Sequence, residues 1–200
     1  MLIDDIYNSS CFLCGLCNVG NKYICIPGKG DPKSRGLIVG EAPGAREDEQ
    51  GIPFVGISGG YISGALAKAG VRPEKVYITN CVKCRPPGNR TPTTEEIEAC
   101  FVYLFEEVRL IDPVAVMTLG NPAMQAVTGL KGGITKKAGL WLRVSRDNED
   151  LLVIPNYHPA FIARNPDKLS FFEEVVDEFV KVWDYGKTHT TEETWQYARP

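Results

Sequence analysis

The fold of this 200-residue chain is decided by the stretch RGLIVGEAPG, residues 35–44. Its short apolar run ends in glycine, which suits a buried strand, and the residues EAPG at 41–44 then end that strand. Further apolar runs at 76–79, 114–119 and 151–155 predict three more strands. The chain is therefore expected to contain four strands spread along its length.

Helical patterns alternate with these strands. Thr93 and Glu96 form a capping-box pair, which marks the start of one helix. The expected helices cover residues 58–70, residues 93–110, a segment that opens at 120–122, and residues 169–183. Strands that alternate with helices imply a parallel sheet with helices on both faces. We therefore predict an α/β fold in three layers, αβα, with a central four-stranded parallel sheet.

Three polar segments each follow the end of a predicted strand. They are residues 40–44, residues 80–90 and residues 156–160. In a parallel sheet the carboxyl ends of the strands meet at one edge, and ligands bind in the crevice outside that edge. The sequence therefore predicts that the three segments converge on a single site.

The composition fits one domain of a soluble protein. A chain of this length can bury a core without a metal, so we expect one domain over 1–186 and a loose, polar tail over 187–200. The start carries no apolar signal segment and no run approaches about 18 apolar residues, which predicts a cytoplasmic protein without a membrane partner. Because the net charge is −3, any contact with DNA would need a local basic patch.

Seven cysteines occur in the chain, and they are not scattered. Two residues separate Cys11 from Cys14, the same spacing recurs at Cys81 and Cys84, and Cys100 follows. In a reducing cytosol, clustered cysteines are more often ligands than disulfides, and an odd count argues against a purely paired framework. The chain has only two histidines, so a metal site would consist mostly of thiolates, which select zinc or an iron–sulfur cluster.

Three motifs, in this order, resemble those of the family-four uracil-DNA glycosylases. They are IVGEAPG at 38–44 with ED at 47–48 and PFVG at 53–56, ITNCVKCRPPGNR at 78–90, and HPAF at 158–161 with RNP at 164–166. The order of the cysteines also matches, and the likeness spans about residues 11–180. The chain therefore looks like a member of that family.

The resemblance implies a four-stranded parallel sheet between helices and a bound [4Fe–4S] cluster. The cluster ligands would be Cys11, Cys14, Cys84 and Cys100. Zinc on the same four sulfurs is the alternative that spacing leaves open. The other three cysteines are expected to act as small buried residues, and they are Cys17, Cys25 and Cys81.

The resemblance also implies a reaction, the cleavage of the bond between uracil and deoxyribose after the nucleotide is flipped out of the stack. The departing uracil gains negative charge, and His158 is expected to donate a hydrogen bond to its O2. Asn80 offers a donor and an acceptor that match the N3–H and O4 of uracil. Phe54 is expected to stack on the flipped base.

Other residues of the motifs are expected to shape the pocket. Gly40, Glu41 and Ala42 would bring backbone groups close to the base, which small side chains permit. Glu47 would wall the C5 side of uracil and exclude the methyl group of thymine, although it could instead be a solvated carboxylate at a helix start. The residue that activates the attacking water is open between two further catalytic candidates, Glu41 and Asn89.

The expected partner is uracil-containing DNA, single- or double-stranded, bound by a monomer. Basic residues near the motifs are expected to contact phosphates, and they are Lys83, Arg85, Arg90 and Arg164. Lys131, Lys136 and Lys137 are candidates to extend this track, or they form an ordinary solvated set. Phe161 is expected to wedge into the gap left by the flipped base.

Two other functions stay open. One is a related glycosylase for another deaminated base, such as hypoxanthine or xanthine, although Asn80 and Glu47 favour uracil. The other is a non-catalytic DNA-binding iron–sulfur module that retains the fold. The presence together of His158, Asn80 and Phe54 argues against such a module, because DNA binding alone does not require this set.

Overall fold

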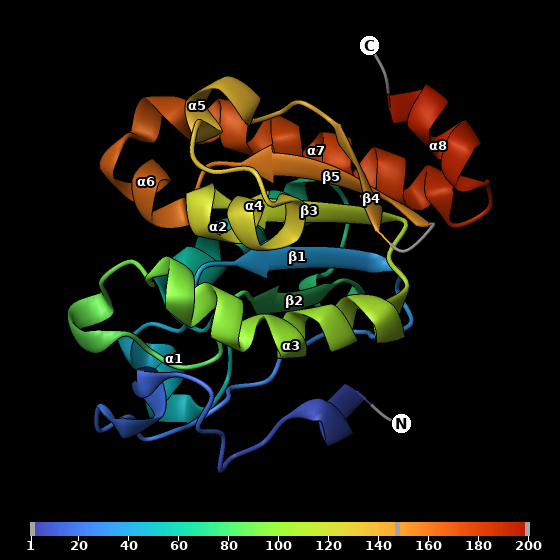
Figure 1. Ribbon diagram of the computed structural model, residues 1–200. Coiled ribbons are helices and arrows are strands. Elements are labelled where there is room, and N and C mark those ends of the chain that lie inside the picture. The colour runs from blue at the N-terminus through green and yellow to red at the C-terminus, as the bar shows by residue number, and fades with distance from the viewer. Residues whose placement is uncertain (1–2, 147–148, 199–200) are drawn as a thin grey trace.

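The computed structural model describes residues 3–146 and 149–198. Within these residues a five-stranded sheet has the strand order β2-β1-β3-β5-β4 (Figure 1). The strands are β1 (Gly36–Gly40), β2 (Tyr77–Asn80), β3 (Ala115–Leu119), β4 (Leu142–Arg146) and β5 (Glu149–Asn156). The neighbours β2, β1, β3 and β5 are parallel, which confirms the four predicted strands and their direction.

The fifth strand, β4, corrects the predicted four-stranded sheet. It runs antiparallel to β5, with Leu142 opposite Val153, and forms an edge of the sheet. Its sequence, LRVSR over 142–146, alternates apolar with polar residues and contains no apolar run. Such alternation is typical of a strand with one covered face, so a search for continuous apolar runs does not find it.

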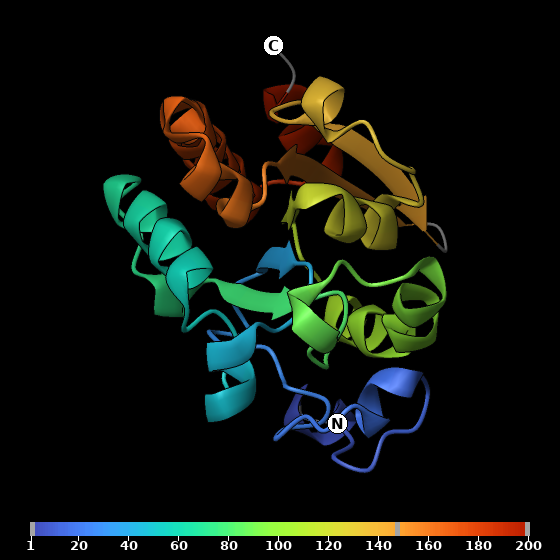
Figure 2. The same cartoon turned by 90° about the vertical axis from the view of Figure 1, so that its left-hand side faces the viewer.

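Helices cover both faces of the sheet, which confirms the three-layer αβα fold (Figures 1 and 2). The helices are α1 (Ala45–Gln50), α2 (Ile57–Lys68), α3 (Thr94–Ile111), α4 (Gly120–Thr128), α5 (Ile134–Lys137), α6 (Pro159–Arg164), α7 (Leu169–Gly186) and α8 (Thr191–Ala198). Short 3-10 turns lie at Ile3–Ile6, Gly15–Asn18, Pro73–Lys75, Pro87–Asn89 and Pro166–Lys168. In the described part of the chain, none of the helices is both long and apolar enough to span a bilayer.

Alternate residues of the central strands supply two hydrophobic cores. Ile38 and Met117 pack with the apolar faces of α2 and α7 on one side of the sheet. Leu37 and Val116 pack with α3 and α4 on the other side. The central strands are therefore buried on both faces, and this burial explains why their sequences are continuous apolar runs.

The predicted start of α3 is confirmed by its capping box. The backbone N–H of Glu96 donates to Thr93 Oγ1 at 3.2 Å, and the backbone N–H of Thr93 donates to Glu96 Oε2 at 2.8 Å. These two bonds satisfy amides that the first turn of a helix otherwise leaves unpaired. The helix thus begins directly after the loop that follows β2, and it carries Cys100 on a buried face.

The tail is not loose along its whole length, which corrects the sequence prediction. Residues Thr191–Ala198 form α8, and this helix packs against α7 (Figure 1). Thr194 and Ala198 are buried, and the ring of Tyr197 stacks on that of Tyr185 with centroids 4.2 Å apart. The polar composition of the tail conceals this contact, because only a few of its side chains face the domain.

Removal of residues 187–200 should therefore destabilise the domain. Loss of the stacked ring pair and of the buried contacts of α8 should lower the free energy of unfolding by about 1–2 kcal/mol. Thermal denaturation followed by circular dichroism should show a melting temperature about 2–8 °C lower. Glu192→Gln is the control, because it removes the charge that pairs with Arg143 but keeps α8 in place. An unchanged melting temperature after truncation would contradict the packing of α8.

Candidate active site

The three polar segments meet at one cavity of about 580 Å³. Its walls come from the segment after β1, the loop after β2 and the turn after β5, so the convergence predicted from the sheet is confirmed. The predicted site residues in the lining are Glu41, Ala42, Glu47, Phe54, Asn80, Asn89, Arg90, His158, Phe161 and Arg164. The volume lies within the range of about 300–1,000 Å³ that is common for small-molecule sites.

Gly40 lies next to the cavity lining, and its lack of a side chain leaves room for two lining residues. A Cβ atom at this position would lie 2.4 Å from Phe54 Cζ and 2.6 Å from Asn80 Oδ1. Both distances are far shorter than any normal contact, so a side chain here would push the ring and the amide apart. The absence of a side chain at residue 40 therefore lets Phe54 and Asn80 lie against each other.

Glu47 fixes the loop that carries Phe54. Phe54 is buried and has a positive φ of 54°, a conformation that non-glycine residues rarely adopt. The buried carboxylate of Glu47 accepts hydrogen bonds, 2.7–3.1 Å long, from the backbone N–H groups of Gly44, Val55 and Gly56. Glu47 is therefore not a solvated helix-start carboxylate, and it holds the strained loop in shape from inside the cavity wall.

Asn80 ends β2 and presents its amide to the cavity. The residue is 5% exposed and lines the pocket. Among the described residues, no group forms a hydrogen bond with its side chain. A buried amide needs hydrogen-bond partners, so the donor and the acceptor of Asn80 are available to a ligand.

His158 is held in a neutral state with one proton available. Its Nδ1 accepts a hydrogen bond from the backbone N–H of Ala160 at 3.2 Å, as the cap of α6. The neutral ring therefore carries its proton on Nε2. Burial, and then the positive charge of Arg164, lower the pKa of His158 to about 4. At neutral pH the ring is thus an uncharged hydrogen-bond donor beside the cavity.

Glu41 and Asn89 are the two candidates for water activation, and they differ in the hydrogen bonds and burial of their side chains. Burial raises the pKa of Glu41, while a hydrogen bond with Thr91 acts in the opposite direction. Asn89 is exposed, and its Oδ1 accepts a hydrogen bond from Arg85 Nε at 2.7 Å. The carbonyl oxygen of Asn89 is thus already used, whereas Glu41 brings a carboxylate into the cavity wall.

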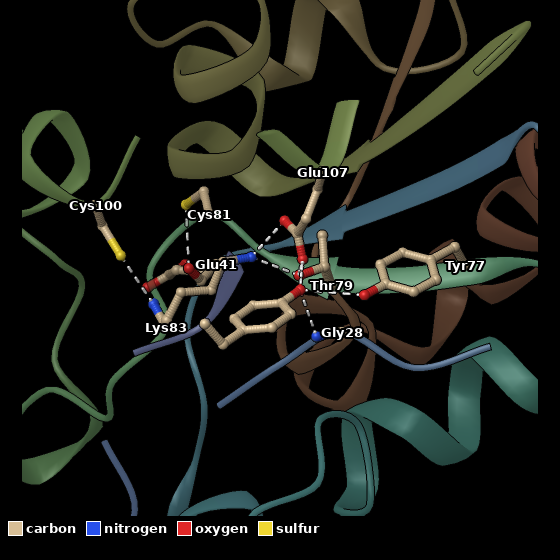
Figure 3. A network of polar contacts seen from close by, with 9 residues as sticks. Gly28, Glu41, Tyr77, Thr79, Cys81, Lys83, Cys100 and Glu107 are labelled. Carbon is tan, nitrogen blue, oxygen red and sulfur yellow. Dashed lines mark hydrogen bonds and ion pairs between the residues drawn. The ribbon is translucent and has the colours of Figure 1, made fainter. Parts of the chain in front are cut away.

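Lys83 lies in the interior, which corrects its prediction as a DNA contact (Figure 3). Its side chain is 1% exposed, its Nζ lies 2.5 Å from Glu107 Oε2, and it donates to Thr79 Oγ1 at 2.6 Å. A buried and paired ammonium group cannot reach a phosphate. The sequence reveals the charge of Lys83 but not its partner, which lies 24 residues away on α3.

The three predicted arginines lie in different surroundings. Arg164 is exposed at the edge of the cavity. Arg90 also lines the cavity, but its guanidinium forms two hydrogen bonds, of 2.6 and 2.8 Å, with the carboxylate of Glu96. Arg85 lies outside the lining and pairs with Asp48 at 4.0 Å. Arg164 therefore offers the most accessible positive charge of the three.

The lining also contains residues that were not predicted from the sequence, and two of them, Arg46 and Thr91, bear on the function. Arg46 is exposed beside the cavity, and Thr91 contributes to the wall next to Glu41. Arg46 lies inside the first motif, two residues after Gly44, so its position was a usable signal. Thr91 directly follows the second motif and carries no charge, so the sequence offers no comparable signal for it.

The three lysines proposed to extend the basic track lie outside the lining of this cavity, although all three belong to the described part of the chain. Two of them are on α5, which borders a neighbouring cavity of about 370 Å³, and they are Lys136 and Lys137. The neighbouring cavity shares Glu41, His158 and Phe161 with the main one. A role of these lysines in DNA binding stays a prediction.

Four cysteines gather beside the second motif from three parts of the chain. Cys11 and Cys14 come from the amino-terminal segment, Cys84 from the loop after β2, and Cys100 from α3. Burial raises the pKa of Cys84 to about 11, and the nearby thiols of Cys14 and Cys11 add to this shift. Backbone N–H groups of Cys25 and Lys83 lie 3.3 Å from the sulfurs of Cys84 and Cys100. Such N–H···S bonds are one means by which proteins tune sulfur ligands.

The state of the cysteine thiols bears on which group they could hold. All seven cysteines lie in the described part of the chain, and all are free thiols. Within that part, no three Cys, His, Asp or Glu side chains form a group compact enough for a single metal ion. Thiolates are the ligands that zinc and iron–sulfur clusters take, so the chemistry of the four cysteines fits either group.

The remaining cysteines are only partly as predicted. Cys25 and Cys81 are buried, which confirms their prediction. Cys17 is partly exposed, and its thiol donates to the backbone oxygen of Cys14 at 3.1 Å, so the prediction of a buried residue is wrong there. Cys17 lies in the short 3-10 turn Gly15–Asn18, in which Leu16 is the buried residue.

The neutral state of His158 can be measured directly. An NMR titration of ring carbons should give a pKa of about 4 for His158, below its ordinary value of 6.5, with the proton on Nε2. Arg164→Gln should raise this pKa, because the change removes a nearby positive charge. Arg109→Gln, on a distant part of α3, is the control. A His158 pKa of 6.5 or higher would contradict the buried, uncharged ring.

Sequence comparisons point to one family. A sequence model described as the Uracil DNA glycosylase superfamily matches residues 27–184. A type-4 uracil-DNA glycosylase of Archaeoglobus fulgidus is 39% identical over 196 residues, which cover 94% of this chain and 96% of that protein. The corresponding enzyme of Pyrobaculum aerophilum is 40% identical and covers 78% of this chain and 85% of its own. That of Thermotoga maritima is 42% identical and covers 72% and 74%. The chain therefore belongs to the type-4 family of the uracil-DNA glycosylase superfamily.

Proposed function

We propose that this protein is a DNA-repair glycosylase that flips a uracil nucleotide out of DNA and hydrolyses its N-glycosidic bond, leaving an abasic site. One observation carries the proposal: a single cavity combines a neutral histidine, an unpaired amide and an aromatic ring, from His158, Asn80 and Phe54. Enzymes that act on a base must bring it out of the stack into such a pocket. The protein acts as a monomer in the cytoplasm, on single- or double-stranded DNA.

His158 supports the departure of the base. As the glycosidic bond breaks, negative charge develops on uracil, and the Nε2–H of His158 donates a hydrogen bond to its O2. The low pKa of His158 keeps the ring uncharged before DNA binds, so no positive charge has to be buried there. A donor fixed in place by the cap of α6 needs no reorganisation during the reaction.

Asn80 and Glu47 select the base. The Asn80 amide accepts from the N3–H of uracil and donates to O4, whereas cytosine presents the opposite pattern at these atoms. Glu47 lines the same cavity and walls the C5 side, so the methyl group of thymine has no room. Because three backbone N–H groups bind its carboxylate, Glu47 forms a rigid wall.

Glu41 is assigned to the attacking water. Its carboxylate lines the cavity and its pKa is raised by burial, which makes it a stronger base than a solvated carboxylate. Asn89 has its carbonyl oxygen bound to Arg85 and is better suited to orient the loop. Gly40 and Ala42, with short side chains or none, leave space for the base next to Glu41.

DNA phosphates are bound at the rim of the cavity. Arg164 and Arg46 are exposed there and supply charge to a protein that is acidic overall. Arg90 shares its charge with Glu96, and Arg85 shares its charge with Asp48, so both contribute less. Phe161 lines the cavity and fills the gap left by the flipped base.

The thiols of Cys11, Cys14, Cys84 and Cys100 hold a [4Fe–4S] cluster. The donor set fits this group, because four neighbouring sulfurs are free and two of them face backbone N–H groups. When bound, the cluster supplies covalent links between the amino-terminal segment, the loop after β2 and α3. These residues thereby stabilise the loop that carries Asn80 and do not act on the base.

A glycosylase assay tests the proposal and its alternatives together. The protein should release uracil from single- or double-stranded oligonucleotides, with less or no release of hypoxanthine or xanthine. His158→Ala should lower the single-turnover rate about 10²–10³-fold, because it removes a hydrogen-bond donor to the departing base. His189→Ala, in the exposed part of the chain, is the matched control and should keep full activity. Release of another base but not uracil would support the related glycosylase, and DNA binding without any release would support the non-catalytic module.

The cluster has its own test. The purified protein should be brown, absorb at roughly 400 nm and contain about four irons per chain. Cys100→Ser should lose most of this absorbance, because it removes a buried ligand, whereas Cys17→Ser should retain it. A colourless protein that contains one zinc ion per chain would contradict the cluster and favour zinc.

A further inference from the structure

A buried polar network joins α3 to the end of β2 (Figure 3). Lys83 and Glu107 have side chains that are 1% and 0% exposed, with Nζ 2.5 Å from Oε2. Thr79 Oγ1 accepts from Lys83 Nζ at 2.6 Å and donates to Glu107 Oε1 at 2.7 Å. The hydroxyl of Tyr7 also donates to Glu107 Oε1 and lies 3.1 Å from the hydroxyl of Tyr77. Both charges are thus paired and hydrogen-bonded.

Stability alone does not explain this ion pair. Transfer of each ion into the interior is unfavourable, and well-packed apolar residues of similar volume are often as stable or more so. Removal of one partner is strongly unfavourable, because it leaves a buried charge without compensation. The network therefore penalises any displacement of Lys83 from Glu107, and it restrains the two segments that carry them.

The restrained segment is the one that bears Asn80. Thr79 lies directly before Asn80, and Lys83 lies three residues after it. Between them, the backbone N–H of Cys81 donates to Gly40 O at 2.9 Å. The backbone N–H of Lys83 also donates to the sulfur of Cys100 at 3.3 Å. Residues of the network thus flank Asn80 in the sequence, with Thr79 before it and Lys83 after it.

Asn80 depends on this backbone for its orientation. Its amide forms no hydrogen bond within the described residues, so no neighbouring polar group fixes it before a ligand binds. A shift of about 1 Å in a positioned group, caused by a change far from the chemistry, can lower a rate about 10²-fold. The positions of Thr79 and Lys83 therefore affect how well the Asn80 amide can form hydrogen bonds with a base.

We infer that Glu107, acting through Lys83 and Thr79, is a positioning residue that sets the Asn80 amide at the edge of the flipped uracil. The inference rests on the proposed uracil excision and adds a residue outside all three motifs to the machinery. Glu107 is not part of the cavity lining or of the four cysteines, and its carboxylate binds Lys83 and Thr79, on either side of Asn80, and Tyr7.

Single-turnover kinetics with Glu107→Gln test the inference. The rate of uracil release should fall about 10–100-fold, as expected for a misplaced amide. Affinity for DNA with an abasic site and absorbance of the cluster should stay unchanged, because the amide contacts neither. Glu106→Gln is the matched control, since Glu106 is the adjacent residue of α3 and pairs with Arg109 at the surface. Loss of the cluster absorbance in Glu107→Gln would overturn the inference in favour of an effect on the cysteines.

A double-mutant cycle separates positioning from general damage. In the background of Asn80→Ala, Glu107→Gln should have little further effect, because the amide that it positions is absent. A full additional loss of rate would overturn the inference and leave uracil excision intact. If the unaltered protein releases no uracil, the proposed function itself fails.

A second variant keeps the test valid if Glu107→Gln does not fold. Lys83→Met combined with Glu107→Leu removes both charges together, and such replacements often preserve or raise stability. This variant should fold with an intact cluster but release uracil about 10–100-fold more slowly, because Thr79 loses both partners. A rate equal to that of the unaltered protein would overturn the inference.

Discussion

The site depends on backbone pairing that continues beyond the ends of β1 and β2. Gly40 O and Glu41 O accept hydrogen bonds from the N–H groups of Cys81 and Val82, at 2.9 and 3.1 Å. The first and second motifs are therefore one rigid unit, although about forty residues separate them in the sequence. Gly40 serves both purposes, because it takes part in the pairing and leaves room for Phe54 and Asn80.

The electrostatics of the site combine neutral groups inside with charge at the rim. His158 is uncharged because it is buried and because Arg164 is near. The same Arg164 is exposed at the cavity edge, where a phosphate would lie. Under the proposed function, the residue that attracts DNA thus also helps to keep the histidine in its donor form. An acidic protein can bind a polyanion in this way, since a few well-placed cations matter more than the net charge.

Much of the fold could be predicted because the central strands are buried on both faces. Residues 37–39 and 115–117 are apolar throughout, and such runs are visible in a sequence. Strand β4 has one covered face and alternates apolar residues with polar ones, so it was not visible as an apolar run. The packing of α8 was hidden for a similar reason, since only Thr194 and Ala198 among its residues are buried.

The positions of site residues could be predicted where the order of strands and helices determines them. They could not be predicted where contacts with residues distant in the sequence determine them. The strand ends brought His158, Asn80 and Glu41 to one cavity, as the order of the elements implied. The burial of Lys83 could not be predicted, because its partner Glu107 lies in an ordinary-looking stretch of an amphipathic helix. The positive φ of Phe54 was equally hidden, since the hydrogen bonds between Glu47 and the next two residues of the loop are not visible in the sequence.

The four gathered cysteines come from three parts of the chain, so the ribosome makes them at different times. Cys100 is the last of the four to be made, and His158 follows 58 residues later. At about 5–20 residues per second, this interval is on the order of 3–12 seconds. During that time all four cysteines have been made, whereas β5 is only being completed and α7 has not been made. All four candidate ligands of the proposed cluster are therefore made before the candidate active site is complete.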